Sequence, residues 1–194
     1  MKLQARLNGL TRSKKMRDRS LVMMFEGMDA AGKGSTIRRM TQAMDARFYR
    51  VIPIAAPTDE ERAQPYLWRF WRNMPGHGEA TIFDRSWYGR VLVERVEKFC
   101  SENDWMRAYN EINSFEEQLK RFKTRQNTPY KQFKITAEDW RNRKKWPAYE
   151  RAVNDMIERT STDPAPWSII ASDDKLFSRI ETLERLCERI ESSL

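Results

Sequence analysis

The feature that most constrains the fold of this chain is a glycine-rich loop between an apolar run and a helical pattern. Residues 21–25 are apolar and bounded by polar residues, which is typical of a buried parallel strand. The next residues have the G-x-x-x-x-G-K spacing of a phosphate-binding loop and read Gly27-Met28-Asp29-Ala30-Ala31-Gly32-Lys33-Gly34-Ser35. Glycines let backbone N–H groups approach an anion, lysine supplies a positive charge, and the following helix adds its positive end. We therefore predict a strand–loop–helix unit that binds phosphate; a plain glycine turn is the weaker alternative.

Two positions in this loop depart from the common pattern. Gly34 stands where Ser or Thr usually reaches Mg²⁺, and Asp29 lies where an acid would repel bare phosphate. An acid at this position suggests a carboxylate that holds the metal or the phosphate acceptor.

Composition excludes several classes of protein. With 194 residues, the chain is most simply one domain with a substantial core. A mean hydropathy of -0.82 and the lack of a long apolar run argue against a membrane protein. Residues 1–20 are basic without an apolar signal core, and Cys100 and Cys187 lie far apart, so we expect reduced thiols in a cytoplasmic protein. His77 is the only histidine, which argues against a histidine metal site or a Ser-His triad.

The charge balance points to a polyanionic partner. The net charge is +8 and the pI is about 9.6. Nucleic acid ranks low because no zinc finger, helix-turn-helix or RNA-binding aromatic motif is present. A nucleotide together with a second phosphate-rich substrate is the more specific hypothesis.

Strand-like and helix-like patterns alternate along the chain, which indicates a parallel α/β sheet. Strands are predicted at 21–25, 49–55, 80–83 and 167–171. Helices are predicted at the N-terminus and at 33–46, 64–73 and 174–192. Between residues 85 and 166 we predict no strand, and an apolar stripe indicates one long helix over about 103–126. Thr136 marks a further helix start, and Pro147 predicts a kink or break.

A second motif follows the third predicted strand, where an apolar run ends in Asp84 and Arg85. An acid in this position can hold Mg²⁺ beside a phosphate loop. Ligands of parallel sheets bind outside the carboxyl ends of the strands. Strand one should therefore lie beside strand three, so that Asp29, Lys33, Asp84 and Arg85 converge.

A third feature is the basic run 141–145, flanked by Trp140 and Trp146. Such a run is usually a solvated helix face. In a phosphoryl-transfer enzyme it would close cations over the transferred group, and beside the two other motifs we favour this lid.

These motifs resemble the family-2 polyphosphate kinases. The main blocks are 25–34, 56–61, 66–72 and 84–90, continued by 93–97, 138–143, 159–162 and 166–167 in the family's order. The likeness is strongest to the polyphosphate:AMP phosphotransferase subgroup, and within it to one half of the tandem two-domain forms.

The resemblance implies a three-layer, thymidylate-kinase-like P-loop fold with a parallel sheet and a helical lid at about 127–162. It implies Mg²⁺-dependent phosphoryl transfer from inorganic polyphosphate to AMP, giving ADP. Asp29 and Asp84 would hold Mg²⁺ and the acceptor phosphate, while Lys33 and Arg85 would bind the phosphates being exchanged. Further phosphate or nucleotide contacts are expected from Gly27, Ala30, Ala31, Gly32, Gly34, Ser35, Arg90, Arg141, Arg143 and Lys144. We also expect a homo-oligomer, with neither nucleic acid nor membrane as partner.

One departure from the family lies after Phe115, where a loop and a parallel strand would stand between two helices. Here the helices are fused, which leaves the sheet without one family strand. Either residues 103–126 form one continuous helix, or a segment has been left out and the chain shows a spatial gap at 115–118. We expect the gap, because an intact sheet is more stable.

Three functions therefore stand side by side. The first is polyphosphate-dependent phosphorylation of AMP, and the second is ATP-dependent nucleotide kinase activity. The third is a polyphosphate- or nucleotide-binding domain without turnover, which the missing strand makes a serious alternative.

Overall fold

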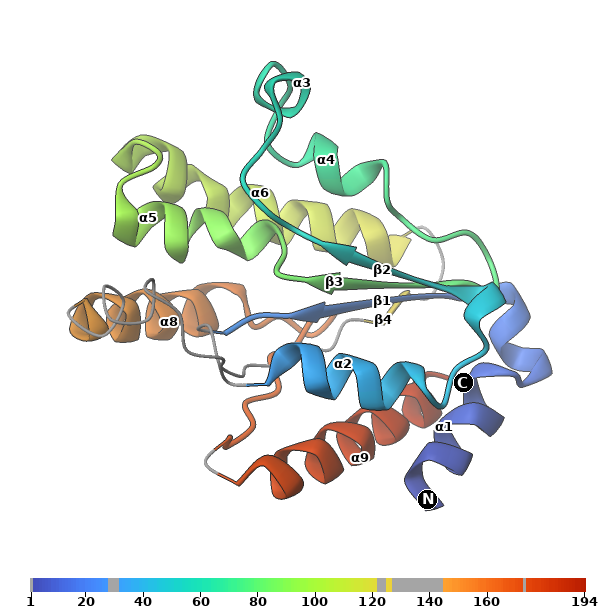
Figure 1. Ribbon diagram of the computed structural model, residues 1–194. Coiled ribbons are helices and arrows are strands. Elements are labelled where there is room, and N and C mark those ends of the chain that lie inside the picture. Colours follow the sequence, from blue (N-terminus) through green and yellow to red (C-terminus); the bar gives the residue numbers. More distant parts are fainter. Residues whose placement is uncertain (1, 28–31, 122–124, 127–144, 173) are drawn as a thin grey trace.

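A four-stranded parallel sheet forms the centre of the computed structural model, which describes residues 2–27, 32–121, 125–126, 145–172 and 174–194 (Figure 1). The strands stand in the order β2-β3-β1-β4. Their bounds are β1 Ser20–Phe25, β2 Tyr49–Pro53, β3 Ala80–Asp84 and β4 Arg125–Gln126. β1 pairs with β3 from Leu21 opposite Ala80 to Phe25 opposite Asp84. The predicted neighbourhood of strands one and three is confirmed.

Strand β1 is apolar from Leu21 to Phe25 because both of its faces are covered. Leu21, Met23 and Phe25 belong to the core on one side of the sheet. Val22 and Met24 belong to the core on the other side. The alternation follows from the two-residue period of a strand.

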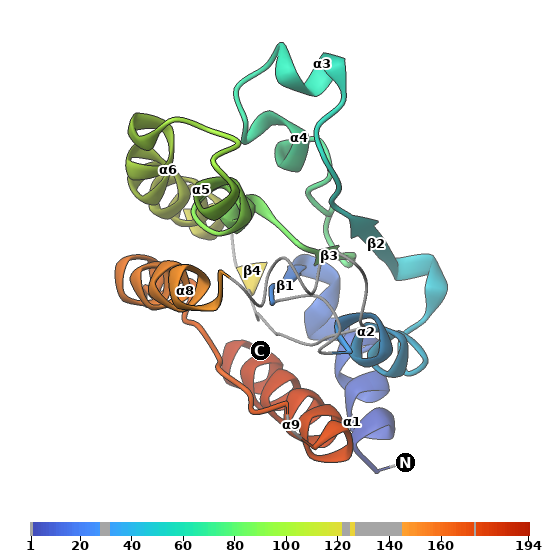
Figure 2. The same cartoon turned by 60° about the vertical axis from the view of Figure 1, so that its left-hand side comes forward.

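Helices form a layer on each face of the sheet (Figures 1 and 2). One layer contains α1 Lys2–Thr11, α2 Lys33–Thr41 and α9 Lys175–Ser193. The other contains α4 Trp68–Trp71, α5 Val93–Glu97 and α6 Glu102–Arg121, with α8 Trp146–Thr160 packed against α5 and α6. The remaining short elements are η1 Lys14–Asp18, η2 Ala46–Phe48, α3 Asp59–Arg62 and η3 Trp87–Arg90. Among the described residues, no helix combines the length and apolarity needed to cross a bilayer.

Local signals explain several helix ends. Asp174 caps α9, since its side chain accepts from the backbone N–H groups of Leu176 and Phe177. Pro147 lies in the first turn of α8, so the predicted interruption is the start of a helix. Thr136, the other predicted helix start, lies outside the described residues.

Two predicted helices are shorter than expected. α2 ends at Thr41 instead of residue 46, before a turn in which Asp45 accepts from the backbone N–H of Arg47. The region 64–73 contains only α4, because Pro65 precedes it and cannot donate a helical hydrogen bond. The acidic residues before it form α3, whose N-terminus is capped by two hydrogen bonds. The Thr58 side chain accepts from the Glu61 backbone N–H, and the Glu61 side chain accepts from the Thr58 backbone N–H.

The expected gap at 115–118 is wrong, because α6 runs unbroken from Glu102 to Arg121. Its sequence contains neither Gly nor Pro, so the backbone ladder can continue through the junction. Its buried stripe continues as well, through Ala108, Ile112, Phe115 and Leu119. The helix nevertheless stops short of the predicted residue 126.

The strand predictions for the C-terminal half are also wrong. A strand does occur between residues 85 and 166, because Arg125 and Gln126 pair with Ser20 and Leu21 as β4. The described residues 167–171 form no strand. A strand needs a neighbour with which to pair, and the described part of β4 offers an edge of two residues. Ile170 still packs into a core, while Ile169 is exposed.

Candidate functional site

The glycine-rich loop joins the end of β1 to the start of α2, as predicted. Gly27 and Gly32 bound its ends with positive φ angles of 143° and 79°. A side chain would be strained in both conformations, which explains glycine at these positions. Gly32 also caps α2, because its carbonyl accepts from the backbone N–H of Thr36 at 2.9 Å. Asp29, Ala30 and Ala31 lie outside the described residues.

Lys33 is the first residue of α2 and is almost fully buried, with 6% of its surface exposed. Its Nζ donates to the carbonyl of Gly27 at 2.9 Å, so the ammonium group lies beside the residue at which the loop begins. A buried ammonium group at this place can attract a phosphate anion strongly, because little water screens it.

Asp84 and Arg85 lie at the carboxyl end of β3, next to the loop. Asp84 stands opposite Phe25, and the Arg85 backbone N–H donates to the Phe25 carbonyl at 2.9 Å. Arg85 has a positive φ of 67°, which is unfavourable for a residue with a side chain. Strain of this kind recurs at functional sites. Sheet pairing thus sets Arg85 directly beside the end of β1.

Glu26 is a buried carboxylate at this site that the sequence analysis missed. Its Oε1 accepts from both the backbone N–H and the hydroxyl of Ser86, each at 2.6 Å. Burial raises the pKa of Glu26, and the Ser86 hydrogen bonds and the charges of Lys33 and Arg85 oppose this rise. Lys33 and Arg85 therefore lie close enough to Glu26 to act on it. The sequence signal that could have identified Glu26 is its position: it directly follows strand one, much as Asp84 stands at the end of strand three.

Ser35 connects the loop to a distant helix. Its hydroxyl donates to the Gly32 carbonyl at 2.8 Å and accepts from Arg179 Nη2 at 3.3 Å. Arg179 lies on α9, 144 positions further along the chain. Sequence spacing held no signal for this additional cation beside the loop.

Gly34 departs from the usual loop pattern without a steric reason. In the part of the chain that the structure describes, a Cβ atom added there would meet no neighbouring atom within 4 Å. Crowding by the described residues therefore does not explain the missing hydroxyl.

The other predicted residues are placed less centrally or not described. Arg90 pairs with Glu94 at 2.8 Å, and its guanidinium lies 4.5 Å from the centre of the Tyr66 ring. Arg141, Arg143 and Lys144 lie outside the described residues. Within the described ranges, no group of three or more His, Cys, Asp or Glu side chains could hold a metal ion.

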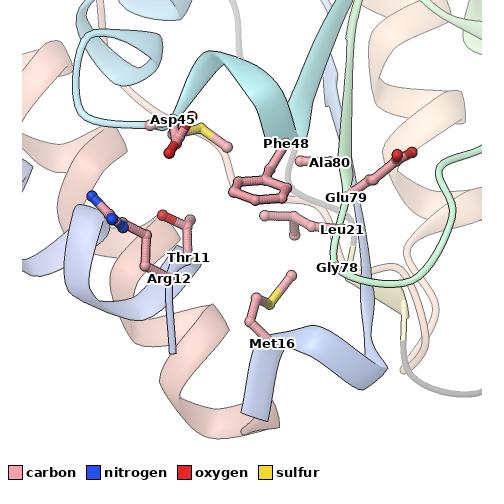
Figure 3. A pocket seen from close by; sticks show the side chains of 10 residues that line it. Thr11, Arg12, Met16, Leu21, Asp45, Phe48, Gly78, Glu79 and Ala80 are labelled. Atoms are coloured by element: carbon pink, nitrogen blue, oxygen red, sulfur yellow. The ribbon is translucent and has the colours of Figure 1, made fainter. Parts of the chain in front are cut away.

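A pocket at the opposite end of the sheet is too small for a substrate (Figure 3). It lies at the strand starts, where Leu21, Ala80 and Phe48 line it together with Met16 and Thr11. Its volume of about 10 Å³ is of the order that one water molecule needs. A wider groove of about 320 Å³ lies between α4 and α6, lined by Trp71, Phe115 and their neighbours.

Comparison with known proteins gives consistent matches over the whole chain. The family model for Polyphosphate kinase 2 (PPK2) matches residues 1–194. The chain is 56% identical to a polyphosphate:AMP phosphotransferase of Pseudomonas aeruginosa, over 98% of this chain. It is 49% identical to the polyphosphate:AMP phosphotransferase of Acinetobacter johnsonii, over 90% of this chain.

Solved structures agree with the fold. A polyphosphate kinase 2 structure from Pseudomonas aeruginosa matches 99% of this chain with a TM-score of 0.95 and 51% identity, over 46% of its own length. The polyphosphate kinase 2 of Arthrobacter aurescens gives a TM-score of 0.90 and 27% identity, over 98% of this chain and 76% of its own.

The relatives are longer than this chain, which spans 42% and 41% of the two phosphotransferases. The alignment with the Pseudomonas relative covers 210 residues, more than the 194 of this chain, so that relative has residues without a counterpart here. The family model, the relatives and the solved structures nevertheless agree on one assignment. The chain belongs to the polyphosphate kinase 2 family.

Proposed function

We propose that this chain transfers the terminal phosphoryl group of inorganic polyphosphate to AMP, giving ADP. The observation that carries the proposal is that Lys33, Arg85 and Asp84 all lie at the carboxyl ends of β1 and β3, next to buried Glu26. The names of the relatives at 56% and 49% identity support polyphosphate as donor and AMP as acceptor.

The reaction needs little covalent help from the protein. The bond between the last two phosphates of polyphosphate breaks, and an AMP phosphate oxygen forms the new bond to phosphorus. The shortened polyphosphate leaves as an anion. Because a phosphate monoester is already ionised near pH 7, the attacking oxygen needs no general base. Catalysis then depends on alignment and on neutralisation of negative charge.

The described residues can supply both effects. The Lys33 ammonium and the loop backbone would bind the donor phosphates. Arg85, held beside β1 by its backbone hydrogen bond, would stabilise charge on the transferred group. Arg141, Arg143 and Lys144 would close over the substrates from a lid that we place at about 127–162.

Asp84 has the chemistry that a magnesium site needs. Mg²⁺ is usually held by one or two carboxylates together with water and substrate phosphates, and Asp84 offers carboxylate oxygens at a strand end. We propose that Asp84 and Asp29 hold Mg²⁺, which would neutralise charge on the bound phosphates.

A turnover assay tests the proposal. The chain is incubated with AMP, Mg²⁺ and polyphosphate, and ADP is measured by chromatography. We expect ADP formation, and we expect Asp84→Asn to abolish it in a protein that remains folded. Turnover with ATP but not with polyphosphate would instead favour an ATP-dependent nucleotide kinase.

One observation favours a second candidate, a polyphosphate-binding domain without turnover. The described part of β4 contains two residues, and the chain spans less than half of the phosphotransferases that it matches. Salt-sensitive polyphosphate binding by folded protein, without any ADP formed, would support this candidate.

Further proposals concern organisation. We propose that residues 1–194 act as one domain, in the cytoplasm, as a homo-oligomer. Cys100 and Cys187 are free thiols, which is compatible with a reducing compartment. Light scattering measures the oligomeric state directly.

A further inference from the structure

Glu116 of α6 is a second buried carboxyl group close to the site, and the reaction described above does not use it. Only 1% of its surface is exposed. Trp87 Nε1 donates to its Oε1 at 2.9 Å, and the Tyr88 hydroxyl donates to the same oxygen. The side chains of Trp87 and Tyr88 are also buried. One oxygen thus receives two hydrogen bonds from adjacent residues of another element.

Trp87 and Tyr88 follow Asp84 and Arg85 closely in the chain, with only Ser86 between the two pairs. Ser86 itself binds Glu26, because its backbone N–H and its hydroxyl both donate to the Glu26 carboxyl group. The segment from Arg85 to Tyr88 is therefore held on one side by Glu26 at the end of β1, and on the other by Glu116 of α6. Its first residue has the strained backbone of φ 67°.

The surroundings of Glu116 are aromatic, which makes a carboxyl group costly there. The Trp87 ring lies 4.9 Å from that of Phe115 and 5.6 Å from that of Phe83, both nearly edge to face. Burial raises the pKa of Glu116 to about 8, although the Tyr88 and Trp87 hydrogen bonds oppose the rise. Among the described residues, its Oε2 has no hydrogen-bond partner. Packing alone would be served as well by an apolar side chain.

An acceptor at this place does what an apolar side chain cannot. Two donors that converge on one oxygen fix the orientation of both rings, and the rings fix the backbone that leads back to Arg85. We propose that Glu116 is a positioning residue that holds the 85–88 segment so that Arg85 meets the phosphates. The inference rests on the proposed function, because it assigns Arg85 to phosphate binding.

Two substitutions separate the role of the acceptor from that of volume. Glu116→Gln keeps an oxygen that can accept both hydrogen bonds, whereas Glu116→Leu keeps the approximate size and removes the acceptor. Glu117→Ala is the matched control, because Glu117 is the next residue and is exposed. Circular dichroism and thermal melting show that each variant is folded.

Two measurements are made on each variant, the polyphosphate Kd and the kcat for ADP formation. For Glu116→Leu we expect kcat to fall about 10- to 100-fold and polyphosphate binding to weaken about tenfold. The KM for AMP should stay within about threefold, since the rest of the site is intact. Glu116→Gln and Glu117→Ala should stay within about threefold of wild type in every quantity.

Equal behaviour of the leucine and glutamine variants would overturn the inference, whether both are active or both are impaired. If Glu116→Leu does not fold, Tyr88→Phe replaces it, since it removes one donor and keeps the ring. A loss of polyphosphate affinity in Tyr88→Phe supports the inference, and unchanged kcat and Kd overturn it. If wild type binds polyphosphate but forms no ADP, the proposed function fails, while the Kd comparison still decides the role of Glu116.

Discussion

At the scale of single residues, the site combines cations with two buried acids. Lys33 and Arg85 are the charges that would meet phosphate, while Glu26 and Glu116 face inward and bind the backbone and side chains of the 86–88 segment. The acids differ in their surroundings. Glu26 has Lys33 and Arg85 nearby, whereas the hydrogen bonds from Tyr88 and Trp87 offset the burial of Glu116.

The pH dependence of stability should reveal Glu116. Its pKa is about 8 in the folded chain and near the ordinary 4.5 when unfolded, so the folded state holds a proton more tightly. Stability should therefore fall as pH rises between these two values, with the loss complete above pH 8. We expect the Glu116→Gln variant, which cannot ionise there, to gain on the order of a few kcal/mol relative to wild type between pH 5 and 8.

Urea unfolding at both pH values measures this difference, and the comparison with wild type cancels the contributions of all other groups. An identical pH dependence in the two proteins would show that the pKa of Glu116 is not raised.

At the scale of elements, α6 does more than cover the sheet. Its buried face supplies Ile112, Phe115 and Leu119 to the core and Glu116 to the 86–88 segment. It also crosses the junction at which the family resemblance predicts a loop and a strand. A continuous helix keeps Glu116 and Leu119 in register with the rest of that face.

Proline at position 117 tests this continuity. In an unbroken α6, Glu117→Pro removes a backbone hydrogen bond in the helix interior and should cost about 3 kcal/mol or more. If a second helix began at residue 117 instead, proline would be tolerated at its first position. Urea unfolding of Glu117→Pro beside Glu117→Ala decides, and a proline variant as stable as the alanine variant would refute the continuous helix.

At the scale of the whole molecule, the net charge of +8 is the dominant property. Excess positive charge attracts a long polyanion at a distance and releases the counterions bound to it. AMP carries far less charge, so its binding should depend more on the local contacts of the site.

Salt should therefore separate the two substrates. Between 50 and 200 mM NaCl we expect the polyphosphate Kd to rise about 10- to 20-fold. This is the rise expected when a protein neutralises about three phosphates of a single-stranded polyanion. The KM for AMP should change about threefold or less over the same range. Isothermal titration and steady-state kinetics provide the two values. Equal salt dependence of both would indicate that the donor is held by no more charges than the acceptor.

Features that depend on neighbouring residues could be predicted from the sequence. The apolar run of β1, the spacing of the glycine loop and the acid that ends β3 are local patterns with local physical causes. The rule that ligands meet the carboxyl ends of parallel strands then brought Lys33 and Arg85 together, and the sheet order agrees.

Only the tertiary structure decided which distant groups meet. The apolar stripe over residues 103–126 predicts that Phe115 is buried, but not that Glu116 accepts a hydrogen bond from the Trp87 indole. Strand pairing likewise depends on which segment of the chain pairs with a given strand. β4 pairs with β1, and residues 167–171 form no strand despite their strand-like pattern. Periodicity and loop spacing are properties of a segment, whereas pairing and hydrogen bonding minimise the free energy of the whole chain at once.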